Sequence, residues 1–238
     1  QKVALAVGKA LPSIEAFVKA LVPRIEKGGR LFYIGSGTSG RLGILDASEC
    51  PPTFGVPDDI VIGLIAGGDA AIRKAKEFAE DDMKGAWRDL QKYRVDEKDT
   101  ILGIAASGKT PYVVGGLKEA QAHNCLTAAL SCVSEAAADE WADYRINILV
   151  GPEFITGSTR MKAGTAQKMA LNMISTALMV RLGRVKDNRM VDMQLANNKL
   201  IDRGTRIIQQ ELGISFREAE ELLMKYKNVR KVLDIKRP

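Results

Sequence analysis

Short apolar runs that favour β-strands alternate with helical stretches along most of this chain. Five such runs are separated by segments with helical spacing or by turns, and they cover residues Arg30–Gly35, Asp59–Ile65, Thr100–Ala105, Leu126–Ser131 and Ile146–Val150. Strands that alternate with helices form a parallel sheet whose two faces are covered by helices. The sequence therefore predicts an α/β fold with three layers, in which a central parallel sheet is flanked by helices.

Longer helical segments lie before and after this alternation. Residues Val3–Ile25 carry apolar side chains at helical spacing, and Ser158–Leu182 is long and rich in Ala, Met and Leu. The chain then becomes charged, and Phe216–Lys227 has the pattern of a capped amphipathic helix. We predict one main domain over residues 1–185 and a small C-terminal helical subdomain over residues 186–238.

Composition argues against several classes of protein. No apolar run approaches the ~18 residues that a membrane span needs, and the start lacks the features of a secretory signal. The net charge of +6 suits an anionic ligand, but no block of Lys and Arg is interleaved with aromatic residues. We expect a cytoplasmic protein that binds neither membranes nor nucleic acid. Because the chain opens at Gln1 and not at Met, we also expect a segment before it.

The cysteines and the single histidine do not suggest a metal site. Cys50, Cys125 and Cys132 are odd in number and lack the paired spacing of a zinc or redox motif. His123 lies in a short polar stretch before an apolar run, which is typical of a surface turn. We therefore expect reduced thiols and no bound metal.

Two loops rich in Ser, Thr and Gly each follow an apolar run and precede a helix. They cover residues 35–40 and 106–111. Backbone N–H groups at a helix N-terminus bind anions, and parallel sheets bind ligands where their strands end. We predict that the two loops together bind a phosphate group through Ser36, Thr38, Ser39, Ser107, Lys109 and Thr110.

Nucleotide binding and a purely structural role are the alternatives for these loops. Gly35, Gly37 and Gly40 match the dinucleotide pattern GxGxxG formally, but Asp46 is too close to serve as the ribose-binding carboxylate expected about 20 residues further on. The Lys-Ser/Thr ending of a P-loop is absent from the first loop. A structural role, in which Gly and Ser only form tight turns, applies to either loop taken singly.

Three stretches of the chain resemble the N-acetylmuramic acid 6-phosphate etherases, which have the sugar isomerase (SIS) fold. Residues 35–55 resemble the first signature of that family, and residues 105–113 its second hydroxyl loop. Residues 151–168 resemble a signature shared with the glucokinase regulatory protein. The resemblance implies an SIS-type sheet, a homodimer, no metal or cofactor, and a further segment before the first helix. It also implies cleavage of the lactyl ether to give N-acetylglucosamine 6-phosphate and D-lactate, in cell-wall sugar recycling.

Such an ether can be cleaved by elimination, because the open-chain aldehyde of the sugar acidifies the proton on carbon 2. The protein then has to supply a base, an acid for the departing lactate and a water molecule. The resemblance implies that Glu49 is the acid and Glu80 the base, although both orders satisfy the chemistry. Without the resemblance, Glu49 is equally explained as a helix-end carboxylate. Glu80 falls in a helix that we expect to begin near Asp69. Together with the nearby Glu77, Asp81 and Asp82 it looks like a solvated helix face.

Arg160 and Lys162 have two readings of equal weight. They can support the bound sugar phosphate, or they can cap or pair at the start of the long helix that follows.

Two other functions compete with the etherase. A sugar-phosphate-sensing regulator similar to the glucokinase regulatory protein would bind its ligand without converting it, but such regulators resemble two of these domains in tandem and 238 residues hold one. An aldose–ketose isomerase of the same fold would also remove the carbon 2 proton. The matches at Glu49 and Glu80 favour the etherase.

Overall fold

The sheet of this protein has five parallel strands. The computed structural model describes residues 1–76 and 78–236. The strands lie in the order β2-β1-β3-β4-β5 and every neighbouring pair is parallel. They are β1 (Leu31–Gly35), β2 (Val61–Ile65), β3 (Thr100–Ile104), β4 (Leu126–Ser131) and β5 (Tyr144–Asn147). The predicted parallel sheet is confirmed.

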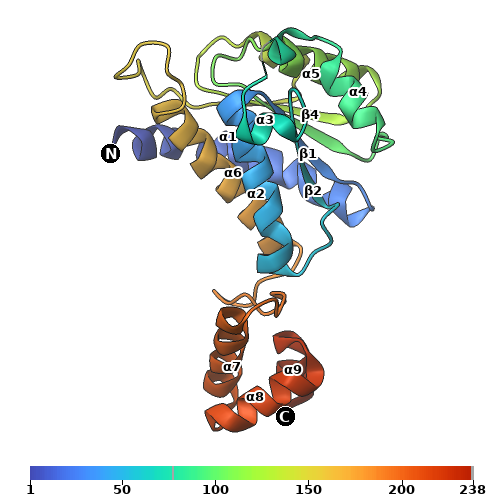
Figure 1. Ribbon diagram of the computed structural model, residues 1–238, viewed down its shortest axis with the longest axis vertical. Coiled ribbons are helices and arrows are strands. Elements are labelled where there is room, and N and C mark those ends of the chain that lie inside the picture. Colours follow the sequence, from blue (N-terminus) through green and yellow to red (C-terminus); the bar gives the residue numbers. More distant parts are fainter. Residues whose placement is uncertain (77, 237–238) are drawn as a thin grey trace. The chain divides into compact units, whose positions relative to one another are not determined.

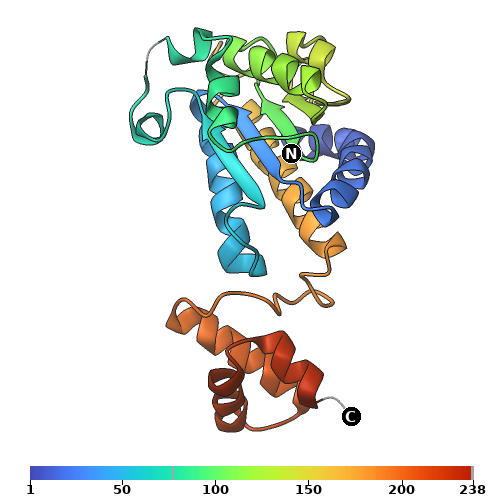
Figure 2. The same ribbon diagram turned by 90° about the vertical axis from the view of Figure 1, so that its right-hand side faces the viewer.

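Helices cover both faces of the sheet, as the alternation of elements predicts. The helices of the described residues are α1 (Lys2–Glu26), α2 (Gly37–Phe54), α3 (Ala70–Arg73), α4 (Gly85–Gln91), α5 (Pro111–Ala122), α6 (Lys162–Arg181), α7 (Asn198–Leu212), α8 (Phe216–Tyr226) and α9 (Val229–Lys236), with 3-10 turns η1 (Ala79–Asp81) and η2 (Ala137–Trp141). Figures 1 and 2 both show α1, α2 and α6 on one face and α4 and α5 on the other. The predicted three-layer arrangement of a parallel sheet flanked by helices is therefore confirmed.

The strand β1 shows why the layers form. All five of its residues are buried, so side chains on both of its faces must pack against helices. Phe32 and Ile34 join the core cluster that includes Leu117 of α5. Tyr33 points to the opposite face, where its hydroxyl donates to Asp46 of α2 at 3.0 Å. Alternate residues of one strand thus serve the two helical layers.

Two elements differ from their predicted positions. The last strand is predicted at Ile146–Val150, but it runs from Tyr144 to Asn147. The reason is its register, because these four residues pair with Ala128–Ser131 of β4. The helix predicted to begin near Asp69 and to contain Glu80 ends at Arg73, since the next residue adopts an extended conformation. Glu80 lies in the separate turn η1, and Glu77 is outside the described residues.

The chain divides into two compact units. Unit 1 comprises residues 1–48 and 59–178, and unit 2 comprises residues 49–58 and 179–238. Unit 2 has an apolar core of its own, built from buried residues of α7, α8 and α9 together with Val191 and Met193, which precede α7. Asn197 and Ser215 cap two of these helices by accepting backbone N–H groups. Unit 2 begins a few residues before the predicted boundary after residue 185 and includes the end of α2.

A buried polar network joins α2, α6 and the sheet within unit 1. Asp46 is 6% exposed, and its carboxylate accepts hydrogen bonds from Tyr33, from Asn172 at 2.8 Å and from Ser175 at 3.1 Å. Burial raises the pKa of Asp46, while these three hydrogen bonds act in the opposite direction. Burying this carboxyl group costs desolvation free energy, and its hydrogen bonds offset part of that cost. The same bonds fix the position of this part of α2 against α6.

We predict that Asp46→Ala lowers the free energy of unfolding by about 3 kcal/mol, because three donors inside the core lose a common acceptor. The melting temperature should fall by about 6–12 °C for a chain of this size. Asp46→Asn is the matched control and should lower the free energy of unfolding by less, since it retains an acceptor oxygen. A loss below about 2 °C in Asp46→Ala would contradict the prediction.

The same residue predicts a dependence of stability on pH. Because the folded pKa of Asp46 is raised, its contribution to the free energy of unfolding falls as pH rises from about 4. This dependence on pH should vanish in Asp46→Asn.

Within the described residues, no helix has both the length and the hydropathy that a bilayer span requires. The same residues contain no group of three or more His, Cys, Asp or Glu side chains that could hold a metal ion.

Candidate active site

The first hydroxyl loop is shorter than its sequence suggests, because α2 begins inside it. Only Ser36 lies between the end of β1 and Gly37, which opens the helix with a φ of 53°. Gly40 lies one turn further on, and a Cβ there would lie 2.8 Å from the carbonyl oxygen of Gly35. The first turn of α2 is thus pressed against the end of β1. The first N–H groups of a helix have no acceptor within the helix, so a helix start of this kind favours an anion.

Glu80 is hydrogen-bonded directly to this loop. The Oγ of Ser36 donates to Oε2 of Glu80 at 2.9 Å, although the two residues are far apart in sequence. Glu80 is exposed in the turn η1, and Phe78 before it has a positive φ of 59° and is 78% exposed. A left-handed conformation at a phenylalanine is uncommon and often accompanies a functional site. The structure therefore holds a carboxylate beside the predicted phosphate site.

A cavity of about 240 Å³ opens at this point. It is lined by Ser36, Gly37, Arg41, Ala66, Ala71, Ala75, Lys76, Phe78 and Glu80. The guanidinium of Arg41 donates to the carbonyl oxygens of Ile72 and Ala71, both at 2.7 Å, and so holds α3 against α2. The cavity thus combines a hydroxyl, a carboxylate and two cationic side chains. Sequence reasoning did not single out Arg41 or Lys76; a basic residue one turn after a glycine-rich helix start was the available signal for Arg41.

The second hydroxyl loop leaves the same edge of the sheet as the first. β1 and β3 are hydrogen-bonded neighbours, with Gly35 opposite Ile104, and neighbouring strands lie about 4.8 Å apart. Ser107 accepts a hydrogen bond from the backbone N–H of Lys109 at 3.3 Å, and Thr110 immediately precedes α5. The two loops therefore emerge from adjacent strand ends, and their joint binding of phosphate stays a prediction.

Glu49 lies well along α2. It is exposed and follows Gly37 by twelve residues. Glu49 is absent from the described residues that line the 240 Å³ cavity. Its role as an acid stays a prediction.

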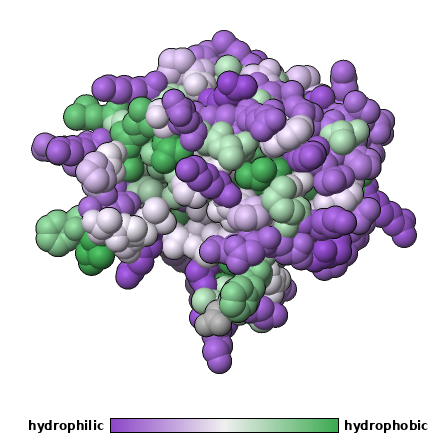
Figure 3. Space-filling view, turned by 90° about the horizontal axis from the view of Figure 1, so that it is seen from above, coloured by the Kyte–Doolittle hydropathy of each residue, from purple (hydrophilic) through white to green (hydrophobic). Residues whose placement is uncertain are grey.

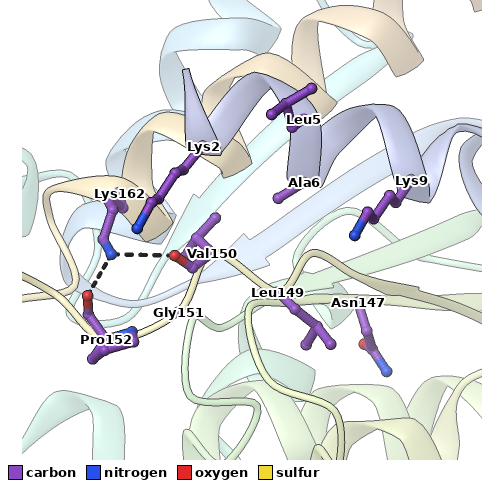
Figure 4. A pocket seen from close by; sticks show the side chains of 10 residues that line it. All are labelled: Lys2, Leu5, Ala6, Lys9, Asn147, Leu149, Val150, Gly151, Pro152 and Lys162. Atoms are coloured by element: carbon purple, nitrogen blue, oxygen red, sulfur yellow. Dashed lines mark hydrogen bonds between the residues drawn. The ribbon is translucent and has the colours of Figure 1, made fainter.

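Lys162 makes contacts that fit its structural alternative. Figure 4 shows its Nζ donating to the backbone carbonyls of Val150, at 3.2 Å, and Pro152. These groups line a second cavity of about 540 Å³, which also contains Lys2 and Lys9 of α1.

The start of α6 is capped by a side chain of the chain itself. Glu153 accepts the backbone N–H groups of Lys162 and Ala163 at 3.0 and 2.9 Å, and these bonds lower the pKa of Glu153. The N-terminus of α6 is therefore already satisfied by an anion. Arg160 lies just before this start and is exposed.

Ser39 and Thr38 of the first loop face α6. Ser39 is 8% exposed, and its Oγ donates to Oε1 of Gln167 at 3.0 Å. Thr38 lies so close to the helix that a Cβ on Gly164 would be 3.3 Å from its methyl carbon. Sequence reasoning did not identify Gln167 or Asp46 as site-supporting residues; a polar residue within an apolar helical run was the signal for both.

Hydroxyl loops at adjacent ends of a parallel sheet place the chain in the class of SIS-domain proteins. The SIS domain model matches residues 82–177, and the model of the glucokinase regulatory protein N-terminal SIS domain matches residues 13–121. The C-terminal lid domain model of glucokinase regulatory protein matches residues 187–234. A phosphoheptose isomerase from Francisella tularensis superimposes with a TM-score of 0.54 and 18% identity, over 77% of this chain and 92% of the isomerase. That likeness concerns the fold alone.

Curated relatives identify the family. N-acetylmuramic acid 6-phosphate etherase from Christiangramia forsetii is 61% identical over 228 residues, which are 96% of this chain and 83% of the relative. The etherase from Porphyromonas gingivalis strain W83 is 57% identical over 230 residues, 97% of this chain and 84% of the relative. The chain belongs to the N-acetylmuramic acid 6-phosphate etherase family, and its prediction as an enzyme of that family is confirmed. The regulator and isomerase alternatives are not favoured.

Proposed function

We propose that this protein cleaves the D-lactyl ether of N-acetylmuramic acid 6-phosphate and yields N-acetylglucosamine 6-phosphate and D-lactate. The reaction would serve the catabolism of N-acetylmuramic acid in peptidoglycan recycling. The observation that carries the proposal is the hydrogen bond from Ser36 to Glu80, which holds a carboxylate at the anion-binding start of α2. A phosphate bound at α2 would thereby bring the carbon chain of the sugar close to a base.

The chemistry then needs only proton transfers. Glu80 removes the proton on carbon 2, and the electron pair forms a double bond between carbons 2 and 3 as the bond from carbon 3 to the lactyl oxygen breaks. Glu49 gives a proton to the departing lactate. Water adds to carbon 3 and gives its proton to Glu49, while Glu80 returns a proton to carbon 2. Both side chains are thereby restored, and the sequence is balanced without an oxidant or reductant. Positioned acids and bases contribute about 100- to 10,000-fold each to such steps.

A homodimer is part of the proposal, and exposed apolar side chains support it. Leu149, Phe154 and Ile155 precede α6 and are 58%, 92% and 59% exposed. Figure 3 shows hydrophobic residues gathered on one side of a largely hydrophilic face. Exposed apolar clusters are typical of protein–protein interfaces.

A cytoplasmic location belongs to the same proposal. Cys125 and Cys132 are thiols and not disulfides, and reduced cysteines are usual in cytosolic proteins. Burial raises the pKa of Cys125 and of Cys132 to about 12, so both side chains stay protonated and slow to oxidise at neutral pH.

The lactate assay tests the function directly. Purified protein is incubated with N-acetylmuramic acid 6-phosphate, and D-lactate is followed with a lactate dehydrogenase. A parallel reaction with glucosamine 6-phosphate is analysed for the ketose. We expect lactate release and no ketose. Binding of the sugar phosphate without lactate would favour the regulator, and ketose formation would favour the isomerase.

A further inference from the structure

The side chain of Gln167 lies entirely inside the protein beneath the first hydroxyl loop. It is 0% exposed, and its Oε1 accepts the hydrogen bond from Ser39. Its Nε2 has no hydrogen-bond partner among the described residues. A buried amide that is only half satisfied is unusual, because an unpaired donor in the interior costs free energy.

The hydrogen bond to Gln167 limits what Ser39 can do. A serine hydroxyl has one proton to donate, and phosphate oxygens near neutral pH act mainly as acceptors. In the observed arrangement this proton is given to Oε1 of Gln167. Ser39 can therefore accept a hydrogen bond, but it cannot donate one to a bound phosphate.

Rotation of the amide by 180° reverses this limit. Nε2 then takes the place of Oε1 and donates to the hydroxyl of Ser39, whose proton becomes available for the phosphate. Each orientation pairs one amide atom and leaves the other unpaired, so neither is strongly preferred in the absence of a ligand. An anion at the loop favours the rotated orientation, because only that orientation allows Ser39 to donate to it.

The residues around Ser39 leave the side-chain amide of Gln167 as the group that sets the direction of the Ser39 hydrogen bond. Ser39 is nearly as buried as Gln167, so bulk water cannot readily replace the amide. The start of α6 packs against Thr38 next door, as the position of Gly164 shows. Further along α6, Asn172 and Ser175 donate hydrogen bonds to Asp46 of α2, and these bonds hold the two helices together.

We propose that Gln167 is a positioning residue that sets the direction of the Ser39 hydrogen bond and thereby controls phosphate recognition by the first loop. The inference rests on the proposed function in taking a sugar phosphate as the ligand. Gln167 itself acts only through Ser39.

The experiment compares Gln167→Glu and Gln167→Leu with the wild-type protein. Affinity for N-acetylglucosamine 6-phosphate and for inorganic phosphate is measured by titration calorimetry, and kcat and KM by lactate release. Burial raises the pKa of a carboxyl group, so the titrations are run well above pH 7, where the carboxylate introduced by Gln167→Glu is ionised. In that form it only accepts, and it retains the Ser39 proton. This variant should raise Kd and KM at least about 10-fold, the loss of one hydrogen bond to a charged group, with kcat within about 3-fold. Gln167→Leu frees the proton and should keep Kd within about 3-fold.

A double-mutant cycle separates this effect from simple charge repulsion. Ser39→Ala and Ser39→Ala/Gln167→Glu are measured alongside, and the penalty of the introduced carboxylate should be at least about 3-fold smaller when Ser39 is absent. An equal penalty in both backgrounds would overturn the proposal, and so would a loss in Gln167→Leu as large as in Gln167→Glu. A melting curve shows whether Gln167→Glu folds. If it does not fold, the affinities of Gln167→Leu and Ser39→Ala are compared instead, and an equal loss of affinity in these two variants rejects the proposal.

The proposed function can fail separately. If the wild-type protein binds the sugar phosphate but releases no lactate, the etherase activity is rejected. The double-mutant cycle of Ser39 and Gln167, measured by affinity, then still tests the role of Gln167. Wild-type protein that binds neither probe would reject both.

Discussion

Glu80→Gln should slow lactate release by about 100- to 10,000-fold, the usual contribution of a positioned general base. An amide cannot take the proton from carbon 2. It can still accept the hydrogen bond that Ser36 donates to Glu80 at 2.9 Å, so the loop and the phosphate site should keep their geometry. We expect the affinity for N-acetylglucosamine 6-phosphate to change by less than about 5-fold, within the range of a single weakened hydrogen bond.

Asp81→Asn is the matched control for this substitution. Asp81 lies in the same 3-10 turn and is also exposed, so the same chemical change is made one residue away. It should leave lactate release within about 2-fold, as surface substitutions usually do. Equal losses in the two variants would assign Glu80 to the solvated face of the turn and remove it from catalysis.

Glu49→Ala should abolish measurable lactate release while leaving the protein folded. Without an acid, lactate must leave as an alkoxide, which costs about 100-fold or more. The side chain is exposed on α2, so its removal should change the free energy of unfolding by less than about 0.5 kcal/mol. Ser48→Ala, at the exposed neighbouring position, is the control and should retain activity. Undiminished release by Glu49→Ala would reject its proposed role.

Exchange of the carbon 2 proton with deuterated solvent distinguishes the acid from the base. A variant that lacks the acid still removes this proton and should retain exchange, whereas a variant that lacks the base should lose it. We expect exchange in Glu49→Ala and none in Glu80→Gln. The reverse result would exchange the two roles, which the chemistry permits.

Much of the fold could be predicted because it depends on local patterns. Continuous apolar runs such as Leu31–Gly35 identify buried parallel strands whatever lies beside them. Boundaries were less predictable where pairing decides them, as the shift of β5 to Tyr144–Asn147 shows. The apparent long helix around Glu80 was wrong because acidic residues with helical spacing describe a solvated turn equally well.

For the site, the sequence by itself determined that loops rich in Ser and Thr follow the ends of two strands. Ser36 and Ser107 follow their strands closely, so the parallel order of β1 and β3 is enough to place both loops at one edge. Only the tertiary structure decided which side chains meet there. Ser36 contacts Glu80 across 44 residues, and Ser39 contacts Gln167 across 128. Such contacts depend on how separate helices pack against the sheet, and no local spacing encodes the direction of a hydrogen bond between them.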